Sequence, residues 1–448
     1  MNSISLERCT DDDDDDVLDY RETPLNACSL ETFCGPKNID QDSEDRPIPL
    51  CLGCYQLNES TGNREGRLDL YAVPVGDKNK HQNKKGAIES FGALPPLTIF
   101  GGDGDGEIPA PGVLDGKWSN HPRYDASGGG FQNYYATAHA NGEIWVHEIR
   151  SNSNNPQQTA FEAALAGKAA SPSSNEGLCL ALAWESPLYG TDENDCTNNS
   201  IFDTRIISSY SDGHTAIHRV RGQQPLNETI GKSAALELEL EHHWDSHKIF
   251  TCPAEVWCAN FIDTNTVVTG GDEGSWKVWD LRQPLTGKPV YHGKDDFGAG
   301  VTVLAPHPKN PRLLAVGSYD ETVAVFDLRK SVGCSSSSSN RRPDELYHSN
   351  SLGGGIWRCK WHPFDHNKLL VAAMHGGCVV GGFEGLYGTN GEERSEFSKV
   401  GFRIQKEFKL HKSMAYGIDW LSSSSGIETA ASCSFYDKAM YLWNTGSS

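Results

Sequence analysis

The sequence lacks several features that would assign it to a large class of proteins at once. It has no apolar run near the roughly 18 residues of a membrane-spanning helix, and no apolar N-terminal segment of a secretory signal. Basic residues are outnumbered as well, with 39 lysines and arginines against 60 aspartates and glutamates and a formal net charge of −21. Without clustered cations we expect no general surface for nucleic acid or anionic membranes.

Familiar catalytic motifs are also missing. There is no G-x-S-x-G elbow (the nearest match, "SYSDG" at 209–213, lacks the first glycine), no H-E-x-x-H, no Walker loop and no G-x-G-x-x-G. The one C-x-x-C pair, Cys51 and Cys54, has no second pair, so structural zinc is not expected. We therefore expect neither a metal nor a cofactor, and any catalysis must use groups brought together from separate parts of the chain.

Thirteen cysteines are scattered along the chain without a compact disulfide framework. Several of them, such as Cys179 and Cys433, lie in apolar runs, where a free thiol behaves as a small buried hydrophobe. This usage fits a reducing compartment, so we expect a cytoplasmic protein. The run "DDDDDD" at 11–16 repels itself and predicts a disordered acidic tail over residues 1–16.

What the sequence does contain is a repeated unit of a tight turn followed by a strand, as in "DETVAVF" from Asp320 to Phe326. Glycine follows the turn residue in five of the seven copies, as tight hairpins prefer. The seven turn residues are Glu65, Asn141, Asp212, Glu273, Asp320, His375 and Asp437.

Upstream of each turn lies a strand-like run that ends in an aromatic residue in six of seven cases: 29–33, 114–118, 180–184, 257–261, 356–361 and 416–420, with 301–305 as the exception. Seven such units predict an all-β fold, a seven-bladed WD40 β-propeller that forms a single domain over 17–448. A β-sandwich with incidental similarity is the alternative. The spacing exceeds the usual ~40–45 residues, which predicts loop insertions near 72–111, 151–177, 186–204, 222–246 and 331–345.

The last repeat ends five residues before residue 448, which leaves blade seven one strand short. An exposed sheet edge promotes aggregation, so the ring has to be closed. We expect the N-terminal segment "VLDYRETPL" at 17–25 to supply the missing outer strand. A ring closed in this way needs no partner to be stable, and we expect a monomer.

Five longer motifs are more specific than the repeat. They are "YQL…GRLDLY" at 55–71, "GGIWRCKWHPF" at 354–364, "AAMHGG" at 372–377, "HKSMAYGIDW" at 411–420 and "SCSFYDKAMYLW" at 432–443. Together they resemble the diphthine methyltransferase family, WD40 proteins of diphthamide biosynthesis. Despite the name, the resemblance implies hydrolysis. The implied reaction removes a methyl ester from over-methylated diphthine on a histidine of translation elongation factor 2, which would be the protein partner.

In a WD40 propeller, the turns between second and third strands share a face with the loops that enter the first strands. The seven turn residues should therefore surround one mouth of the central channel. An aspartate at this position usually closes its own turn, which is the alternative reading for Asp320 and Asp437. His375 places an imidazole there and is our candidate general base, with a structural histidine as the alternative.

Other side chains should approach the same mouth. Arg358 is a candidate catalytic donor to the oxyanion of ester cleavage, with a polar rim as the alternative. The implied substrate carries a trimethylammonium group, which aromatic faces bind when carboxylates lie nearby. The candidate substrate-binding residues are Trp257, Glu273, Tyr319, Asp320, Trp357, Tyr416 and Asp437.

Water should attack the ester directly, because no serine or cysteine stands in a recognisable activating context. The competing function is a non-catalytic adaptor. "WDLR" at 279–282 and "FDLR" at 326–329 fit the W-D-x-R pattern of receptors that dock on cullin-4 ubiquitin ligase adaptors. The same letters also end an ordinary WD repeat.

Overall fold

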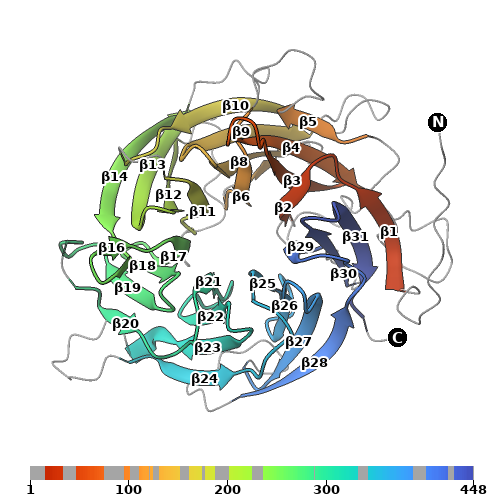
Figure 1. Cartoon of the computed structure of the whole chain (residues 1–448). Helices are drawn as coiled ribbons and strands as arrows, with labels where there is room; N and C mark the ends of the chain where they lie inside the picture. The colour runs from red at the N-terminus through yellow and green to blue at the C-terminus, as the bar shows by residue number, and fades with distance from the viewer. Residues whose placement is uncertain are drawn as a thin grey trace.

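Seven antiparallel sheets stand in a ring around a common axis in the computed structural model of the chain (Figure 1). The structure describes residues 16–33, 47–74, 95–100, 110–120, 122–124, 131–151, 161–173, 177–186, 201–223, 236–286, 288–330, 342–386, 400–421 and 428–446. The predicted all-β seven-bladed propeller is confirmed. A separate hairpin of β15 (Lys248–Ile249) and β16 (Cys252–Pro253) precedes blade four.

The four main strands of each blade follow one another from the axis outward. Blade one has β2 (Asn26–Thr32), β3 (Ile48–Leu57), β4 (Arg64–Val73) and β5 (Leu97–Phe100). Blade two has β6 (Val113–Trp118), β8 (Phe131–His139), β9 (Ile144–Ser151) and β10 (Phe161–Ala169), with the short β7 (Arg123–Tyr124) beside β8. Blade three has β11 (Cys179–Trp184), β12 (Ile201–Tyr210), β13 (His214–Gln223) and β14 (Glu237–Asp245).

The other four blades repeat this arrangement. Blade four has β17 (Val256–Asp263), β18 (Thr266–Gly271), β19 (Trp276–Asp280) and β20 (Tyr291–Gly293). Blade five has β21 (Val301–Pro306), β22 (Leu313–Ser318), β23 (Val323–Asp327) and β24 (Asp344–His348), with the 3₁₀ turn η3 (Leu328–Lys330) after β23. Blade six has β25 (Arg358–Trp361), β26 (Lys368–Ala372), β27 (Cys378–Glu384) and β28 (Gly401–Phe408). Blade seven has β29 (Ala415–Trp420), β30 (Thr429–Ser434), β31 (Ala439–Asn444) and β1 (Val17–Glu22).

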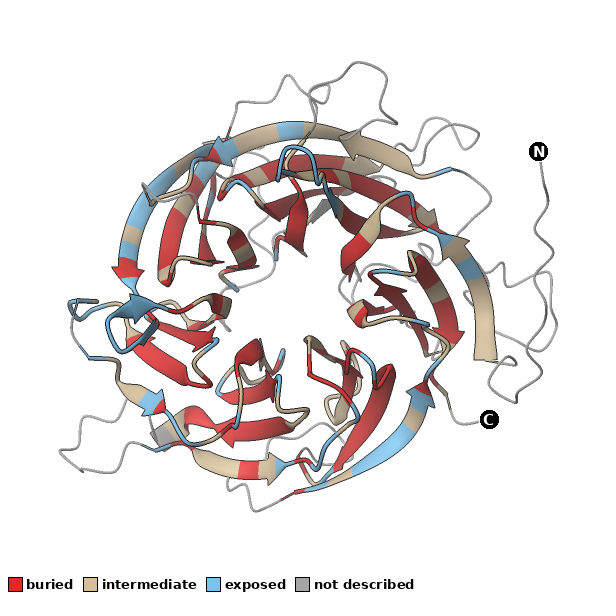
Figure 2. Cartoon of the chain, viewed as in Figure 1, coloured by how far each residue is buried: buried red, intermediate tan, exposed pale blue. Residues whose placement is uncertain are grey.

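The hydrophobic core lies between neighbouring blades. One cluster of buried side chains fills each of the seven interfaces, including the interface between blades seven and one. Tryptophans that end first strands fasten these interfaces, because their indole N–H reaches a backbone carbonyl of the preceding blade. Trp184, Trp361 and Trp420 each form this bond at 2.9 Å. Figure 2 shows the result, with buried inner strands and more exposed outermost strands.

The ring closes between the two ends of the chain, as expected. β1 pairs antiparallel with β31, with Val17 opposite Trp443 and Glu22 opposite Ala439. The rings of Tyr20 and Tyr441 lie 5.0 Å apart across this pair. The strand that appeared to be missing from blade seven is thus supplied by the start of the chain (Figure 1).

Three stretches that we expected to be loop insertions contain outermost strands instead. β5 lies within 72–111, β10 within 151–177 and β14 within 222–246. An outermost strand pairs on one side only and leaves many side chains exposed, so its apolar pattern is weak. Much of the other two insertions, at 187–200 and 331–341, lies outside the described residues.

The prediction for the turn of blade one is wrong. Glu65 lies within β4, and the turn of blade one occupies 58–63. Asn58 in that turn donates to Glu65 Oε1 at 2.7 Å. The first blade therefore has a longer turn than the repeat pattern predicted.

Three expectations concern the surroundings of the ring. Residues 1–15 of the predicted acidic tail lie outside the described residues, but Asp16 forms an ion pair with Lys406 on β28 at 2.6 Å. The nine cysteines of the described ranges are free thiols, eight of them buried. No helix in those ranges is long and apolar enough to cross a membrane.

Candidate functional site

We call the side of the ring that carries the turns between second and third strands, and the loops entering first strands, the turn face. Aromatic side chains from five blades meet on it, and we refer to them as the aromatic cluster. Its members are Tyr55, Trp257, Tyr319, Trp357, Tyr416, Phe435 and Tyr436. Four of the seven candidate substrate-binding residues, Trp257, Tyr319, Trp357 and Tyr416, belong to this cluster.

Trp357 is the centre of the aromatic cluster. Its ring stacks on Tyr416 with centroids 4.8 Å apart and an interplanar angle of 24°. Trp257 and Tyr319 meet it at steep angles of 66° and 78°, with centroids at 5.4 and 6.1 Å. Trp257 and Tyr319 are 6.5 Å apart, so the three ring planes point in different directions.

A run of glycines brings the loop that carries Trp357 against the turn that carries His375. A Cβ on Gly354 would lie 2.2 Å from Ala373 O and 2.9 Å from His375 N, so only glycine fits there. A Cβ on Gly355 would lie 3.0 Å from the Tyr319 ring and 3.4 Å from Met374 Sδ. This close approach explains the "GGG" that precedes Trp357 and places the His375 turn beside the aromatic cluster.

His375 lies in the turn between β26 and β27 and its side chain is exposed. Within the described part of the chain, the imidazole forms no hydrogen bond or ion pair. The preceding residue, Met374, has a φ of 38° and bridges to Ala415, next to Tyr416. His375 is thus an exposed histidine on the turn face whose imidazole has no hydrogen-bond partner among the described residues.

The three candidate carboxylates at blade turns bind groups of their own turn and of the loop that enters the first strand of the same blade. Asp320 accepts hydrogen bonds from Gly298 N at 2.7 Å and Thr322 Oγ1 at 2.6 Å. Asp437 accepts from Lys412 N at 2.8 Å and from Ser434 Oγ. Both aspartates therefore have the hydrogen bonds expected of a residue that closes its turn. Neither forms a hydrogen bond with a ring of the aromatic cluster among the described residues.

Glu273 has the same role in blade four. Its Oε1 contacts buried His247 Nδ1 at 2.5 Å, while His247 Nε2 contacts Thr269, which accepts from Trp279. Burial would raise the pKa of Glu273, but the bonds from His247 and Ser275 overcome this and lower it to about 2. The chain Trp279–Thr269–His247–Glu273 ties strands β18 and β19 to the loop that carries His247 and to the turn that carries Glu273.

Arg358 lies deeper than the aromatic cluster, on the first strand of blade six. Its Nη1 donates to Trp357 O at 3.1 Å, and its Nη2 contacts Asp115 Oδ1 at 3.2 Å. The guanidinium carbon is 5.6 Å from the Trp357 ring centroid. Of its five N–H groups, these bonds use two.

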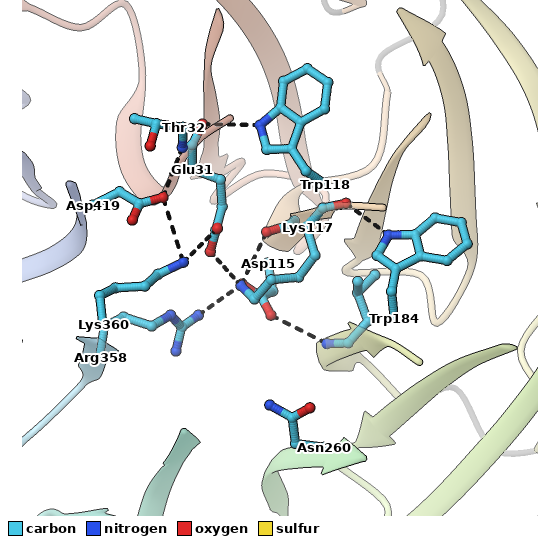
Figure 3. A network of polar contacts seen from close by, with 12 residues as sticks. Glu31, Thr32, Asp115, Lys117, Trp118, Trp184, Asn260, Arg358, Lys360 and Asp419 are labelled. Atoms are coloured by element: carbon cyan, nitrogen blue, oxygen red, sulfur yellow. Dashed lines mark hydrogen bonds and ion pairs between the residues drawn. The ribbon is translucent and has the colours of Figure 1, made fainter. Parts of the chain in front are cut away.

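Arg358 belongs to a network of charged side chains around the axis, in which the carboxylates are buried and the cations are partly exposed (Figure 3). Lys117 Nζ lies 2.7 Å from Asp115 and 2.6 Å from Glu31. Lys360 contacts Glu31 and lies 3.6 Å from Asp419. The members come from β2, β6, β25 and β29, so the network joins blades one, two, six and seven.

The charge network is balanced, with three cations and three carboxylates. Burial would raise the pKa of Asp115, but Lys117 and Arg358 outweigh it and the pKa lies below its ordinary value. For Asp419 burial prevails, and its pKa lies above the ordinary value although Lys360 opposes this. The network thus holds Arg358 in a fixed position below Trp357.

Two carboxylates of the site are not apparent from the sequence pattern. Asp272 Oδ1 accepts from Trp257 Nε1 at 3.2 Å, and the backbone of Asp272 donates to Glu255 O at 2.9 Å. Burial and the nearby Asp272 raise the pKa of Glu255. Burial also raises the pKa of Tyr319, and both carboxylates add to this. Asp272 directly precedes the turn residue of its blade, as Tyr319 and Tyr436 do in theirs. This shared position in the repeat is the sequence feature that places Asp272 near the aromatic cluster.

Comparison with known proteins places the chain in a family. The WD domain, G-beta repeat family matches residues 239–280. A diphthine methyltransferase homolog of Dictyostelium discoideum is 31% identical over 349 residues, which cover 74% of this chain and 76% of the relative. Human diphthine methyltransferase is 30% identical over 401 residues, covering 89% of this chain and 70% of the relative. The chain belongs to the diphthine methyltransferase family.

A further member of the diphthine methyltransferase family, from Saccharomyces cerevisiae, is 25% identical and covers 96% of this chain and 98% of its own length. The solved structure of a mitotic checkpoint complex contains a chain with a TM-score of 0.54 and 10% identity, covering 99% of this chain and 100% of that one. At this identity the similarity shows the propeller fold alone.

The two W-D-x-R-like motifs of this family member form local ion pairs. Arg282 contacts both carboxylate oxygens of Asp280 at 2.8 Å, and Arg329 contacts Asp327 at 2.7 Å. Both arginines therefore close the end of their own repeat. Docking to a cullin-4 ligase adaptor stays a prediction.

Proposed function

We propose that this protein hydrolyses the methyl ester of diphthine methyl ester on translation elongation factor 2 and so produces diphthine in diphthamide biosynthesis. The observation that carries the proposal is the aromatic cluster with adjacent carboxylates in a chain that belongs to the diphthine methyltransferase family. The relatives' name concerns diphthine, and the turn face of this chain offers the groups that such a side chain needs.

The aromatic cluster suits the trimethylammonium group of the substrate. Each aromatic face contributes roughly 0.5–2 kcal/mol to binding a quaternary ammonium. Trp257, Tyr319 and Trp357 present rings in three orientations, and Asp272 and Glu255 add negative charge beside them. Methyl groups prevent hydrogen bonds to the cation, so rings and nearby carboxylates are the suitable ligands.

Ester cleavage would use two further residues, His375 on the turn face and Arg358 on β25 below Trp357. In our proposal the neutral imidazole of His375 takes a proton from a water molecule, whose oxygen attacks the ester carbonyl carbon. Arg358 or backbone N–H groups stabilise the resulting oxyanion. When the intermediate collapses, the bond to the methoxy group breaks, the imidazolium returns the proton, and methanol and a carboxylic acid are released.

Intact-mass measurement tests the proposal. Purified protein is mixed with elongation factor 2 that carries the methyl ester, and methanol is measured in parallel. Loss of one methylene unit from the factor with equimolar methanol release is the expected result. A factor of unchanged mass that co-elutes with the protein would contradict hydrolysis and favour a non-catalytic binding role.

A further inference from the structure

Exposed large apolar side chains are unevenly distributed over the described residues. Four of them lie on the outermost strands β1, β10, β14 and β28: Tyr20, Leu165, Leu240 and Ile404. The other five lie on the turn face: Leu57, Ile249, Phe250, Tyr319 and Tyr436. Among the described residues, the opposite face of the ring carries none of them. The turn face is thus the end of the ring that carries exposed large apolar side chains, and exposed apolar surface is where macromolecules dock.

The most exposed of these side chains forms the tip of the β15–β16 hairpin. Phe250 is 98% exposed and has a φ of 55°, in a two-residue loop between Ile249 and Cys252. Glycine normally takes a positive φ at this position, because a side chain strains the backbone. A strained, fully exposed phenylalanine gains nothing within the monomer, and strain of this kind is found at functional sites.

The hairpin is firmly attached to the propeller and leads into the aromatic cluster. Its base is buried His247, which is bonded to Glu273 and Thr269. Ala254 N donates to His247 O at 3.2 Å, and the chain then continues through Glu255 to Trp257. The apolar tip is therefore linked to Trp257 of the aromatic cluster by a short segment of chain that is anchored to the propeller.

Leu57 lies on the turn face at a different blade. It is 49% exposed at the end of β3, two residues beyond Tyr55 of the aromatic cluster. Figure 1 shows the hairpin at the rim between blades three and four and β3 in blade one, on the other side of the axis. The two apolar groups are thus too widely separated to contact one small ligand.

We propose that Leu57 and the tip residues Ile249 and Phe250 form a docking surface for the folded protein around the modified histidine. The inference rests on the proposed function, since it takes the protein substrate as the occupant. The side chain that reacts would enter the aromatic cluster while apolar patches of the surrounding protein contact the two anchors. A free ester of the modified amino acid would use the cluster alone.

The test compares two substrates with two variants. Phe250→Asn and Leu57→Ser each remove an exposed apolar anchor, and Asn tolerates the positive φ at position 250. With methyl-esterified elongation factor 2, KM should rise about tenfold while kcat is unchanged. With a short peptide that carries the same esterified histidine, both variants should match the wild type.

Ile404→Ser on β28 is the matched control, because it removes a 44% exposed side chain from an outermost strand. It should leave KM for both substrates unchanged. The docking surface is wrong if Phe250→Asn and Leu57→Ser also leave KM for the factor unchanged, or if they lose as much activity on the peptide. Thermal melting of all three variants should match the wild type.

Failure of the proposed hydrolysis gives a different result. In that case the wild type releases no methanol from either substrate, and docking is measured as the Kd for fluorescently labelled elongation factor 2. A Kd about tenfold weaker for Phe250→Asn than for Ile404→Ser would support the docking surface. Equal Kd values would overturn it.

Discussion

The hydrogen-bond partners of a side chain at a blade turn decide what that side chain does. Glu273 is fixed by His247 and Ser275, and Asp320 by Gly298 and Thr322. His375 occupies the corresponding place in blade six without such partners among the described residues. The same position in the repeat can therefore stabilise a blade or remain available for chemistry.

Removal of the Glu273 carboxylate should affect stability and leave the reaction unchanged. Glu273→Ala leaves Nδ1 of buried His247 without its partner, which costs about 1–3 kcal/mol of the free energy of unfolding. Urea denaturation measures this loss. Glu273→Gln keeps an acceptor and should lose less, and KM for the ester should match the wild type in both variants. A raised KM in a stably folded Glu273→Gln variant would return this residue to the substrate-binding set.

Substitution of His375 should have the opposite effect, with a loss of activity and no loss of stability. His375→Ala removes the proposed general base, and we expect kcat for methanol release to fall by about 10²–10⁴-fold. Because the side chain is exposed, the melting temperature should not change. If the folded variant turned over at the wild-type rate, His375 would have no part in the mechanism.

Substitution of Tyr319 tests directly whether the aromatic cluster binds the trimethylammonium group. Tyr319→Ala removes one ring that meets Trp257 and Trp357, and we expect KM for the ester to rise by about 2- to 30-fold. Tyr319→Phe keeps the ring and should stay close to the wild type. Titration with tetramethylammonium, followed by tryptophan fluorescence, should show the same order of affinities. Equal affinities in all three proteins would exclude cation binding by this ring.

The positions of the rings of this site could be predicted from the sequence, but the contacts of its carboxylates could not, for a physical reason. Trp257, Tyr319, Trp357 and Tyr416 stand at fixed offsets from predicted strand ends, so the repeat alone places them on one face. The role of Asp272 depends on where the Trp257 indole points. Contacts between side chains of this kind follow from packing and are not visible in the spacing of residues.

At the scale of elements, first and outermost strands differ in how well the sequence reveals them. A first strand ends in an aromatic ring because the ring packs across a blade interface and donates to it, as Trp420 does to Lys360. An outermost strand such as β14 has one unpaired edge and many exposed side chains. Its composition resembles that of a loop, which is why the sequence predicts insertions where β5, β10 and β14 lie.

β1 is an outermost strand that the sequence did predict, because the repeat count left a place for it. Deletion of residues 1–25 should expose the edge of β31 and remove the contacts of Tyr20 with Tyr441. We expect a lower melting temperature and association at high concentration, measured by differential scanning fluorimetry and light scattering. Deletion of residues 1–15 keeps β1 and is the matched control. Equal behaviour of the two truncations would mean that this pairing does not hold the ring closed.

At the scale of the whole molecule, two kinds of interaction hold the ring together. The seven hydrophobic clusters join each blade only to its neighbours. The charge network adds a contact between blades that are not neighbours, since Arg358 of blade six reaches Asp115 of blade two. Removal of one cation from this network leaves a buried carboxylate without its partner, which is more costly than loss of the whole pair.

Buried neutral histidines connect the stability of the entire ring to pH. Burial lowers the pKa of five of them from the ordinary 6.5 to about 4: His139, His218, His307, His362 and His411. Between these pH values the folded protein keeps the imidazoles neutral, while the unfolded chain binds protons. Unfolding therefore takes up protons, and the free energy of unfolding must fall as the pH is lowered from about 6.5 toward 4.

Urea denaturation at pH 7.5, about 6.5, 5.5 and 4.5 tests this expectation. Above pH about 6.5, these histidines should contribute little to the pH dependence of the free energy of unfolding. Below that pH, the free energy of unfolding should fall with each step. His411→Asn can keep a contact with Ser432 and should reduce the proton uptake on unfolding by about one. An unchanged proton uptake in this variant would mean that His411 is charged in the folded ring, and a free energy that stayed level down to pH 4.5 would contradict the prediction for the whole set.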